Sequence, residues 1–189
     1  MLTAFLLALA TGGRLSELHA LLRAEDFLSF EEQGVSLFPN PNFLSKNENP
    51  GDRRGPIFIS CLRHKDGSPH PLCPVFNLRK FLALSRQSPS IKLFVKPSDL
   101  TELPLSKLRW FICKFIRLAE PGSFPKGHDL RKIASSFAFF RHMTLEEICS
   151  LTGWSSFRVF KRHYLRNIEA VKSSIVVLGS SVPGSAKDV

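Results

Sequence analysis

Tyrosine is almost absent from this chain, in which Tyr164 stands alone beside seventeen phenylalanines. The two side chains share a ring, but a tyrosine hydroxyl needs a hydrogen-bond partner wherever it is buried. A chain that builds its core with phenylalanine therefore does not use tyrosine as general aromatic filler. The single hydroxyl of Tyr164, in the basic stretch from Phe160 to Leu165, requires an explanation of its own.

Long apolar runs are also absent. The stretch from Met1 to Ala10 is nearly all apolar, but it is far shorter than the roughly 20 residues that a membrane-spanning helix needs. No basic residue precedes Arg14, so the charged start of a secretory signal peptide is missing. We expect a buried helix here. A core helix that begins at Met1 also suggests a domain whose earlier part is missing.

Cysteine is scarce, and the four cysteines form no disulfide-rich pattern, so a reducing intracellular setting is expected. One local pattern leaves an alternative open. The pairs Cys61-x-x-His64 and His70-x-x-Cys73 have a spacing at which Cys and His can face one Zn²⁺. The loop between them is much shorter than in familiar zinc modules. A polar loop with two half-buried thiols is therefore the favoured interpretation.

Acidic residues are in short supply, with 16 Asp or Glu against 26 Lys or Arg and a net charge of +10. Such an excess indicates a polyanionic partner, most simply nucleic acid. The excess of basic residues is concentrated between Leu105 and Arg166, a segment with twelve basic and four acidic residues. The same half of the chain contains Tyr164.

Periodicity and turn signals predict a mostly helical α+β domain with one small antiparallel β-sheet. Helix-like stretches alternate with turn formers, and Asp129 and Thr144 are typical helix caps. Short alternating segments suggest a hairpin or a three-stranded sheet within residues 34–60. The expected helices are 1–10, 14–22, 72–86, 105–118, 129–140, 144–153 and a last one carrying Tyr164, and the expected strands are 35–37, 57–59 and 92–95.

A tyrosine can break a DNA strand without losing the bond energy by forming a covalent phosphotyrosine. Its pKa of about 10 makes it a poor nucleophile at neutral pH unless nearby cations stabilise the developing charge. Arginine suits the nonbridging phosphate oxygens, and a lysine or histidine can protonate the leaving 5′ oxygen. This chemistry requires no metal, nucleotide or other cofactor.

The chain contains these residue types in an order that suggests a single catalytic site. An arginine follows a Gly-Gly turn, a lysine lies in a loop rich in turn formers, and a His and an Arg stand three apart at an expected helix start, where backbone N–H groups favour anions. A tryptophan and the tyrosine follow. The candidate catalytic residues are Arg14, Lys46, His128, Arg131, Trp154 and Tyr164.

These positions resemble the catalytic domain of the tyrosine recombinase (phage integrase) family. The family's Thr-Gly-x-Arg-x-x-Glu-Leu setting is matched by Thr11 to Leu18, and its His-x-Leu-Arg motif by His128 to Arg131. Its His or Trp after Gly is matched by Trp154. The resemblance extends from Met1 to about Ile168. It predicts a tyrosine recombinase-like catalytic domain over 1–172, without its first helix and its N-terminal DNA-clamp domain, and a loosely ordered tail over 173–189.

The resemblance also implies a role for each residue. Two arginines would bind the scissile phosphate while the tyrosine attacks it, giving a 3′-phosphotyrosine that a 5′ hydroxyl then reverses. Glu17 would support the turn of the first arginine. The implied roles are phosphate binding for Arg14 and Arg131, protonation of the leaving oxygen by Lys46, contacts around the phosphate and nucleophile for His128 and Trp154, and attack by Tyr164.

The implied partners are double-stranded DNA and further copies of the chain assembled on it, without a membrane. A finer similarity, to recombinases of eukaryotic DIRS and Ngaro-type retroelements, is carried by the run Leu72 to Val75 and by the ending that contains Gly-Trp-Ser-Ser and then His-Tyr-Leu. The expected location is nuclear if the host is eukaryotic and cytoplasmic otherwise.

Departures from the family pattern leave alternatives open. Trp154 and Tyr164 are ten positions apart, where the family usually has nine, and Lys65 is a substitute for Lys46 as the general acid. Without a clamp domain, a non-catalytic DNA-binding remnant of a mobile element is a second hypothesis. A type IB topoisomerase-like activity, which shares the chemistry without a partner strand, is a third.

Overall fold

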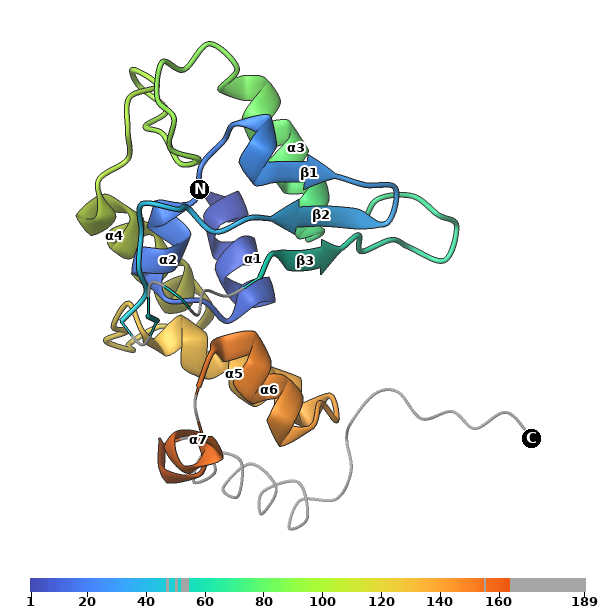
Figure 1. The fold of residues 1–189 in the computed structure, drawn as a ribbon, viewed down its shortest axis with the longest axis vertical. Coiled ribbons are helices and arrows are strands. Elements are labelled where there is room, and N and C mark those ends of the chain that lie inside the picture. The colour runs from blue at the N-terminus through green and yellow to red at the C-terminus, as the bar shows by residue number, and fades with distance from the viewer. Residues whose placement is uncertain (47, 50, 52–54, 155, 164–189) are drawn as a thin grey trace.

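The computed structural model describes residues 1–46, 48–49, 51, 55–154 and 156–163 (Figure 1). It confirms the expectation of a mostly helical α+β fold with one small antiparallel sheet. Helices surround a central α1, and the sheet lies along one side of it. The elements are α1 (Leu2–Thr11), α2 (Leu15–Ala20), a 3-10 turn (Glu25–Phe27), β1 (Leu28–Phe30), β2 (Gly34–Leu37), β3 (Ile57–Ser60), α3 (Pro74–Leu84), α4 (Leu105–Ala119), α5 (Asp129–Phe140), α6 (Leu145–Thr152) and α7 (Phe157–His163).

The sheet has the strand order β1-β2-β3, and both pairings are antiparallel. Val35 lies at its centre, opposite Phe30 on one side and Ile59 on the other. The predicted β2 and β3 are confirmed. The third strand, β1, lies before the region in which the sequence pattern predicted strands. It has only three residues, too few to show an alternating pattern, and it becomes a strand through its pairing with β2.

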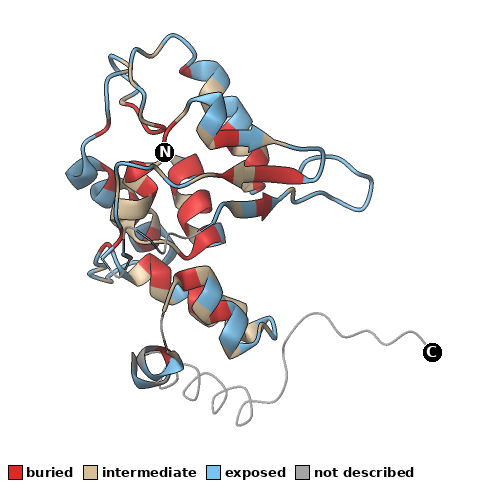
Figure 2. Cartoon of the chain, viewed as in Figure 1, coloured by how far each residue is buried: buried red, intermediate tan, exposed pale blue. Residues whose placement is uncertain are grey.

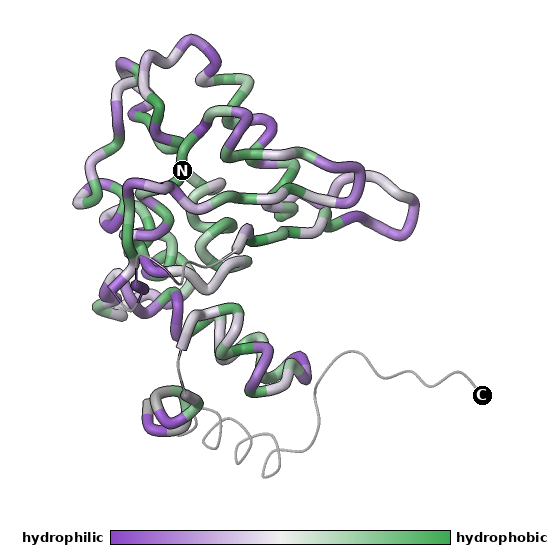
Figure 3. Tube along the Cα trace, in the orientation of Figure 1, coloured by the Kyte–Doolittle hydropathy of each residue, from purple (hydrophilic) through white to green (hydrophobic). Residues whose placement is uncertain are grey.

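Helix α1 forms the centre of the core, as the apolar run predicted. Ala4 and Leu7 are fully buried, and α1 contacts α3, α4 and α5. A helix that is apolar on all sides is stable only when other elements surround it. Figures 2 and 3 show this region as buried and hydrophobic, whereas the turns at the far end of the sheet are exposed and hydrophilic.

The ends of α6 follow local signals. Thr144 accepts a hydrogen bond from the Glu147 backbone, the Glu147 carboxylate accepts one from the Thr144 backbone, and Gly153 ends the helix in the left-handed region at φ 62°. The capping box and the closing glycine are therefore confirmed. At α7, the Ser156 hydroxyl accepts a hydrogen bond from the Arg158 amide, as a capping serine does.

Three local predictions are wrong. Asp129 is the first residue of α5 rather than its cap, since His128 takes the cap position. Helix α2 ends at Ala20, and Leu22 pairs as an isolated bridge with Lys92. The predicted strand 92–95 consequently forms only isolated bridges instead of a ladder.

A second, smaller cluster holds the C-terminal helices together. Phe160 on α7 is 1 % exposed and packs with Ile148 on α6, Phe139 on α5 and Trp154. The cluster therefore fixes where the described part of α7 sits against α5 and α6. The predicted tail, 173–189, lies outside the described residues. Within the described part of the chain, no helix is long and apolar enough to cross a membrane.

The central position of α1 predicts a large stability loss on truncation of Leu7. Replacing this fully buried leucine with alanine leaves a cavity, and we expect the free energy of unfolding to fall by about 2–5 kcal/mol. Leu84→Ala is the matched control, because Leu84 is 85 % exposed and its truncation should cost less than about 0.5 kcal/mol. Urea unfolding followed by tryptophan fluorescence measures both; equal losses would contradict the burial of α1.

Candidate functional site

The turn between α1 and α2 places Arg14. Gly12 ends α1 in the left-handed region at φ 57°, which side chains other than glycine rarely adopt. A β-carbon at Gly12 would lie 3.3 Å from the Thr152 methyl group, so the turn packs closely against the end of α6. Arg14 then caps α2 with extended backbone. The Gly-Gly pair thus brings the turn that carries Arg14 next to the end of α6, which is distant in sequence.

The Glu17 carboxylate holds Arg14 in place. It accepts hydrogen bonds from the Arg14 backbone N–H and from the Arg14 guanidinium, both at 2.7 Å. Ser45, which is 5 % exposed, donates its hydroxyl to the same carboxylate and accepts from the Arg14 guanidinium at 2.9 Å. Glu17 is only 18 % exposed, so these bonds are largely shielded from water. The arginine side chain is therefore fixed before any ligand binds.

Arg131 reaches the same carboxylate from α5. Its Nη1 lies 3.9 Å from Glu17 Oε2, and the residue is 7 % exposed. Its Nη2 donates to the Thr152 carbonyl at the C-terminal end of α6, where helix carbonyls lack internal partners and favour cations. The guanidinium also lies over the Trp154 ring at 5.1 Å. The structure thus brings Arg14 and Arg131 together around the Glu17 carboxylate.

Trp154 takes its position from the end of α6. After Gly153, the Trp154 amide donates back to the Cys149 carbonyl at 3.0 Å, which closes the helix with a Schellman turn. The half-buried indole then lies between Arg131 and Phe160, whose ring centroid is 5.9 Å away. The tryptophan therefore connects the second arginine to α7.

His128 lies at the edge of the site. The preceding Gly127 packs so closely on α2 and α4 that a β-carbon there would be 2.5 Å from Leu15 and 3.1 Å from Arg109. The His128 side chain is 62 % exposed, and its Nε2 is 3.6 Å from Asp129 Oδ1. Burial opposes ionisation of Asp129, but the Lys126 amide and Lys132 outweigh it and lower the pKa of the carboxyl. The histidine is open to a ligand.

The two candidate lysines lie at opposite ends of the sheet. Lys46 is exposed in the loop that joins β2 to β3, directly after Ser45. Lys65 lies in the loop after β3, which leaves the sheet from the other end (Figure 1). Only Lys46 is adjacent in the chain to a residue that contacts Arg14 and Glu17. Tyr164 lies outside the described residues and directly follows His163 of α7.

Sequence reasoning missed three contributors to the site. Ser45 and the Thr152 carbonyl bind the arginines and Glu17, and Gly127 allows α5 to begin close to α2. Of these three contributors, only Gly127 had a signal in the sequence, namely a glycine directly before His128. The Ser45 contact depends on where a loop folds back, and the Thr152 contact uses backbone, which no residue pattern reveals.

The Cys and His loop has a structural role. Cys73 is 1 % exposed, and its sulfur accepts hydrogen bonds from the Leu62 and Phe76 amides, which caps α3. The His64 and His70 rings lie 4.8 Å apart. No group of three or more His, Cys, Asp or Glu side chains in the described ranges could hold a metal ion.

The fold is that of tyrosine recombinase catalytic domains. The chain matches the XerA recombinase with a TM-score of 0.59, at 16% identity over 92% of this chain and 56% of that one. It matches the XerH site-specific recombinase bound to its difH substrate with a TM-score of 0.61, at 14% identity over 92% and 46%. The Tn1549 transposon integrase in complex with transposon right end DNA gives 0.53, at 14% over 94% and 58%.

By sequence, the chain matches no family model and no curated protein. It spans about half the length of the XerA and XerH chains that it matches. At these identities the comparison establishes the fold. The predicted catalytic-domain-like architecture is therefore confirmed.

The shared carboxylate predicts a stability loss in Glu17→Ala. Removing it leaves two guanidiniums close together and poorly hydrated, and we expect the free energy of unfolding to fall by about 1–3 kcal/mol. Lys96→Ala is the control, because the Lys96–Asp99 pair, 3.1 Å apart, is exposed and should contribute less than about 1 kcal/mol. Urea unfolding compares the two; a Glu17→Ala loss no larger than that of the control would mean that the carboxylate does not hold the arginines.

Proposed function

We propose that this domain cleaves and rejoins DNA strands through a 3′-phosphotyrosine intermediate, in integration or site-specific recombination. The observation that carries the proposal is the approach of Arg14 and Arg131 to the single Glu17 carboxylate. A phosphate is an anion with a similar set of oxygen acceptors. Two guanidiniums held this close together can share the nonbridging oxygens of one phosphate.

The arginines would act mainly on the transition state. Phosphoryl transfer builds charge on the nonbridging oxygens, and fixed cations in a shielded site stabilise that charge without reorganising. Arg131 is held by the Thr152 carbonyl and Trp154, and Arg14 by Glu17 and Ser45. Their positions are therefore set by the protein before DNA binds, which reduces the entropic cost of the reaction.

The remaining proposed roles belong to Tyr164, Lys46 and His128. Tyr164, which lies outside the described residues and directly follows α7 in the chain, supplies the nucleophile. Phe160 packs against Trp154, which lies over Arg131, so contacts link α7 to the second arginine. Lys46 protonates the leaving 5′ oxygen, and the exposed His128 donates a hydrogen bond to the phosphate.

Double-stranded DNA is the proposed partner. The XerH recombinase is bound to difH substrate, and the Tn1549 integrase is in complex with transposon right end DNA. Basic side chains that would contact DNA phosphates are exposed on the C-terminal half of this chain. They include Lys107, Arg109, Lys114, Arg117, Lys126, Arg141, Arg158 and Arg162. We further propose that the active form is an oligomer of the chain assembled on DNA and that its catalytic domain covers residues 1–172.

A nicked suicide DNA substrate tests the chemistry. The wild-type chain should form a covalent protein–DNA adduct, seen as a band of reduced mobility in denaturing gels, and Tyr164→Phe should form none. Arg14→Ala and Arg131→Ala should each slow adduct formation by about 10²–10³-fold, because each removes a donor that stabilises the transition state. Arg63→Ala is the control, since this exposed arginine lies in the loop after β3, away from the site.

The outcomes separate the three hypotheses. Salt-sensitive DNA binding without any adduct, also in a chain extended by an upstream helical domain, would contradict the enzyme and support a DNA-binding remnant. An adduct that joins to a second duplex supports a recombinase. If the chain forms the adduct but only relaxes supercoiled DNA and joins no second duplex, a topoisomerase-like activity is supported instead.

A 5′-bridging phosphorothiolate substrate tests the role of Lys46. A thiolate leaves without needing a proton, so a variant that lacks only the general acid should cleave this substrate normally. We expect Lys46→Ala to cleave ordinary DNA about 10²–10⁴-fold more slowly and to regain near wild-type rates on the phosphorothiolate.

Lys65→Ala is the matched control and should cleave both substrates like the wild type. Rescue of Lys65→Ala instead of Lys46→Ala would transfer the role to Lys65. A slow Lys46→Ala that the sulfur substrate fails to rescue would show that Lys46 binds DNA rather than donating a proton.

A further inference from the structure

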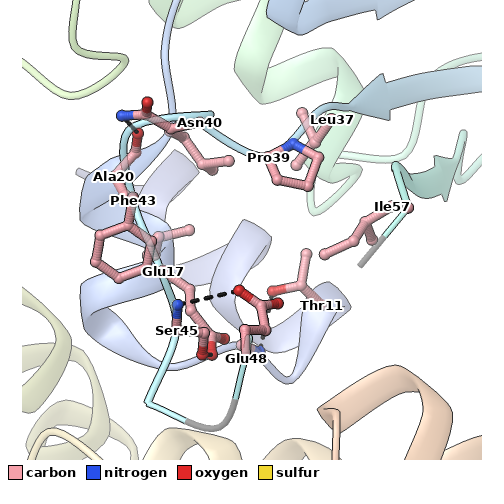
Figure 4. Close-up of a pocket in the computed structure, with 14 residues that line it drawn as sticks. Thr11, Glu17, Ala20, Leu37, Pro39, Asn40, Phe43, Ser45, Glu48 and Ile57 are labelled. Atoms are coloured by element: carbon pink, nitrogen blue, oxygen red, sulfur yellow. Dashed lines mark hydrogen bonds between the residues drawn. The ribbon is translucent and has the colours of Figure 1, made fainter. Parts of the chain in front are cut away.

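The outer face of α4 combines exposed apolar side chains with basic ones. The inner face, where Ile112 is fully buried, packs on α1 and α2. On the opposite face, Trp110 is 53 % exposed and Leu118 is 68 % exposed. This face is separate from the cavity beside Glu17 and Ser45 (Figure 4), since the two share no lining residue. None of the roles proposed above uses Trp110 or Leu118.

Four side chains of this face line a shallow hollow in the surface. They are Trp110, Lys114, Arg117 and Leu118, and the hollow has a volume of about 280 Å³. Their spacing of i, i+4, i+7 and i+8 places them on one side of the helix. The Lys114 ammonium lies 5.1 Å from the centre of the Trp110 ring, and the Phe111 ring lies 5.0 Å from it at an angle of 75°. These contacts orient the indole and leave about half of the residue in water.

The charge of α4 favours a polyanionic ligand. The helix has 15 residues, of which four are basic and none is Asp or Glu. By their spacing, Lys107, Lys114 and Arg117 lie on the same side as Trp110. Within the described ranges, none of these three cations forms an ion pair with a carboxylate. They can therefore bind the phosphates of a nucleic acid.

The exposed indole favours an unpaired strand over a duplex. A duplex presents its phosphates to a protein but keeps the faces of its bases stacked inside. An unpaired strand exposes those faces, and they stack on aromatic side chains while Lys and Arg bind the backbone. A protein partner fits this face less well, because lysine is depleted in protein–protein interfaces and both Lys107 and Lys114 are neighbours of Trp110. An unpaired strand uses both the indole and the cations.

We infer that the outer face of α4 binds an unpaired DNA strand, with a base on the Trp110 ring and the adjacent phosphates at Lys114 and Arg117. An exposed cation–π contact is weak, so Lys114 can leave the ring for a phosphate when a base stacks there. The choice of DNA rests on the function proposed above, in which a cleaved strand is passed to a second duplex.

The face adjoins the candidate catalytic site. Arg109 precedes Trp110 in α4, and a β-carbon at Gly127 would lie 3.1 Å from the Arg109 Nε atom. Gly127 in turn directly precedes His128. A strand released at the site would therefore have a binding surface close by.

Binding of short oligonucleotides to the whole chain tests this face without any strand cleavage. An oligodeoxythymidine of about eight nucleotides should bind with a Kd on the order of 10 µM at low salt. An abasic oligonucleotide with the same number of phosphates cannot stack, so it should bind about 5–100-fold more weakly. In a chain labelled with 5-fluorotryptophan, the Trp110 resonance should shift saturably in fluorine NMR with the oligothymidine.

Two substitutions at Trp110 test the stacking. Trp110→Ala should weaken oligothymidine binding by about 5–100-fold, to the level of the abasic oligonucleotide, whereas Trp110→Phe keeps a ring and should lose less than about fivefold. Phe58→Ala is the matched control and should bind like the wild type, because Phe58 is 49 % exposed but lies on β3.

A lysine substitution tests the phosphate contact. Lys114→Gln should make the plot of log affinity against log salt less steep by about 0.7, the slope that one phosphate contact to a single strand contributes. Lys80→Gln is the matched control and should leave the slope unchanged. Lys80 also lies over an aromatic ring four residues earlier, that of Phe76, but on α3.

Four results would overturn the inference. Equal affinities for the oligothymidine and the abasic oligonucleotide, or an unchanged affinity in Trp110→Ala, would mean that no base stacks on this face. A fluorine shift at Trp154 alone would place the strand at the arginine pair. Oligouridine binding more than about tenfold tighter would make the ligand RNA. An oligoglutamate peptide of equal charge that binds as tightly would show selection by charge alone.

The two proposals fail separately. A wild-type chain that binds oligothymidine at Trp110 but forms no adduct with the suicide substrate would contradict strand cleavage and leave the α4 face standing. A chain that forms the adduct, but whose oligothymidine affinity is the same in Trp110→Ala, would contradict the α4 face alone.

Discussion

The fold around the site depends on one carboxylate shared by two guanidiniums. Glu17 accepts hydrogen bonds from Arg14 and Ser45 and lies within 3.9 Å of Arg131, so it connects α2, the loop after β2 and α5. Two cations that are 7 % and 23 % exposed would repel each other without it. The pairing explains how a strongly basic chain keeps two arginines together in the absence of a ligand. It also leaves them oriented toward a common anion.

Close backbone contacts support this arrangement. Gly12 lets the α1–α2 turn approach Thr152, and the Thr152 carbonyl in turn binds Arg131. The Schellman turn at Gly153 directs Trp154 onto that arginine and toward Phe160. The path from the first arginine to α7 is thus a continuous series of contacts.

Local signals made much of the fold predictable. The nearly all-apolar α1, the Thr144 capping box and the closing Gly153 depend on neighbouring residues, and all three are confirmed. Strand β1 could not be predicted, because its three residues become a strand only by pairing with β2. In the site, motif order identified both arginines, but Ser45 contributes through a loop that folds back onto α2, a long-range contact that no local pattern encodes.

A double-mutant cycle on the cleavage rate most directly tests whether Arg14 and Arg131 act on one phosphate. Rates for the wild type, each arginine-to-alanine variant and the double variant give a coupling free energy. If the two guanidiniums share one phosphate, the double variant should lose less transition-state stabilisation than the two single variants lose in sum. Residues that act as a unit behave in this way. Losses that add to within about 0.5 kcal/mol would show that the arginines act independently, and would contradict the account.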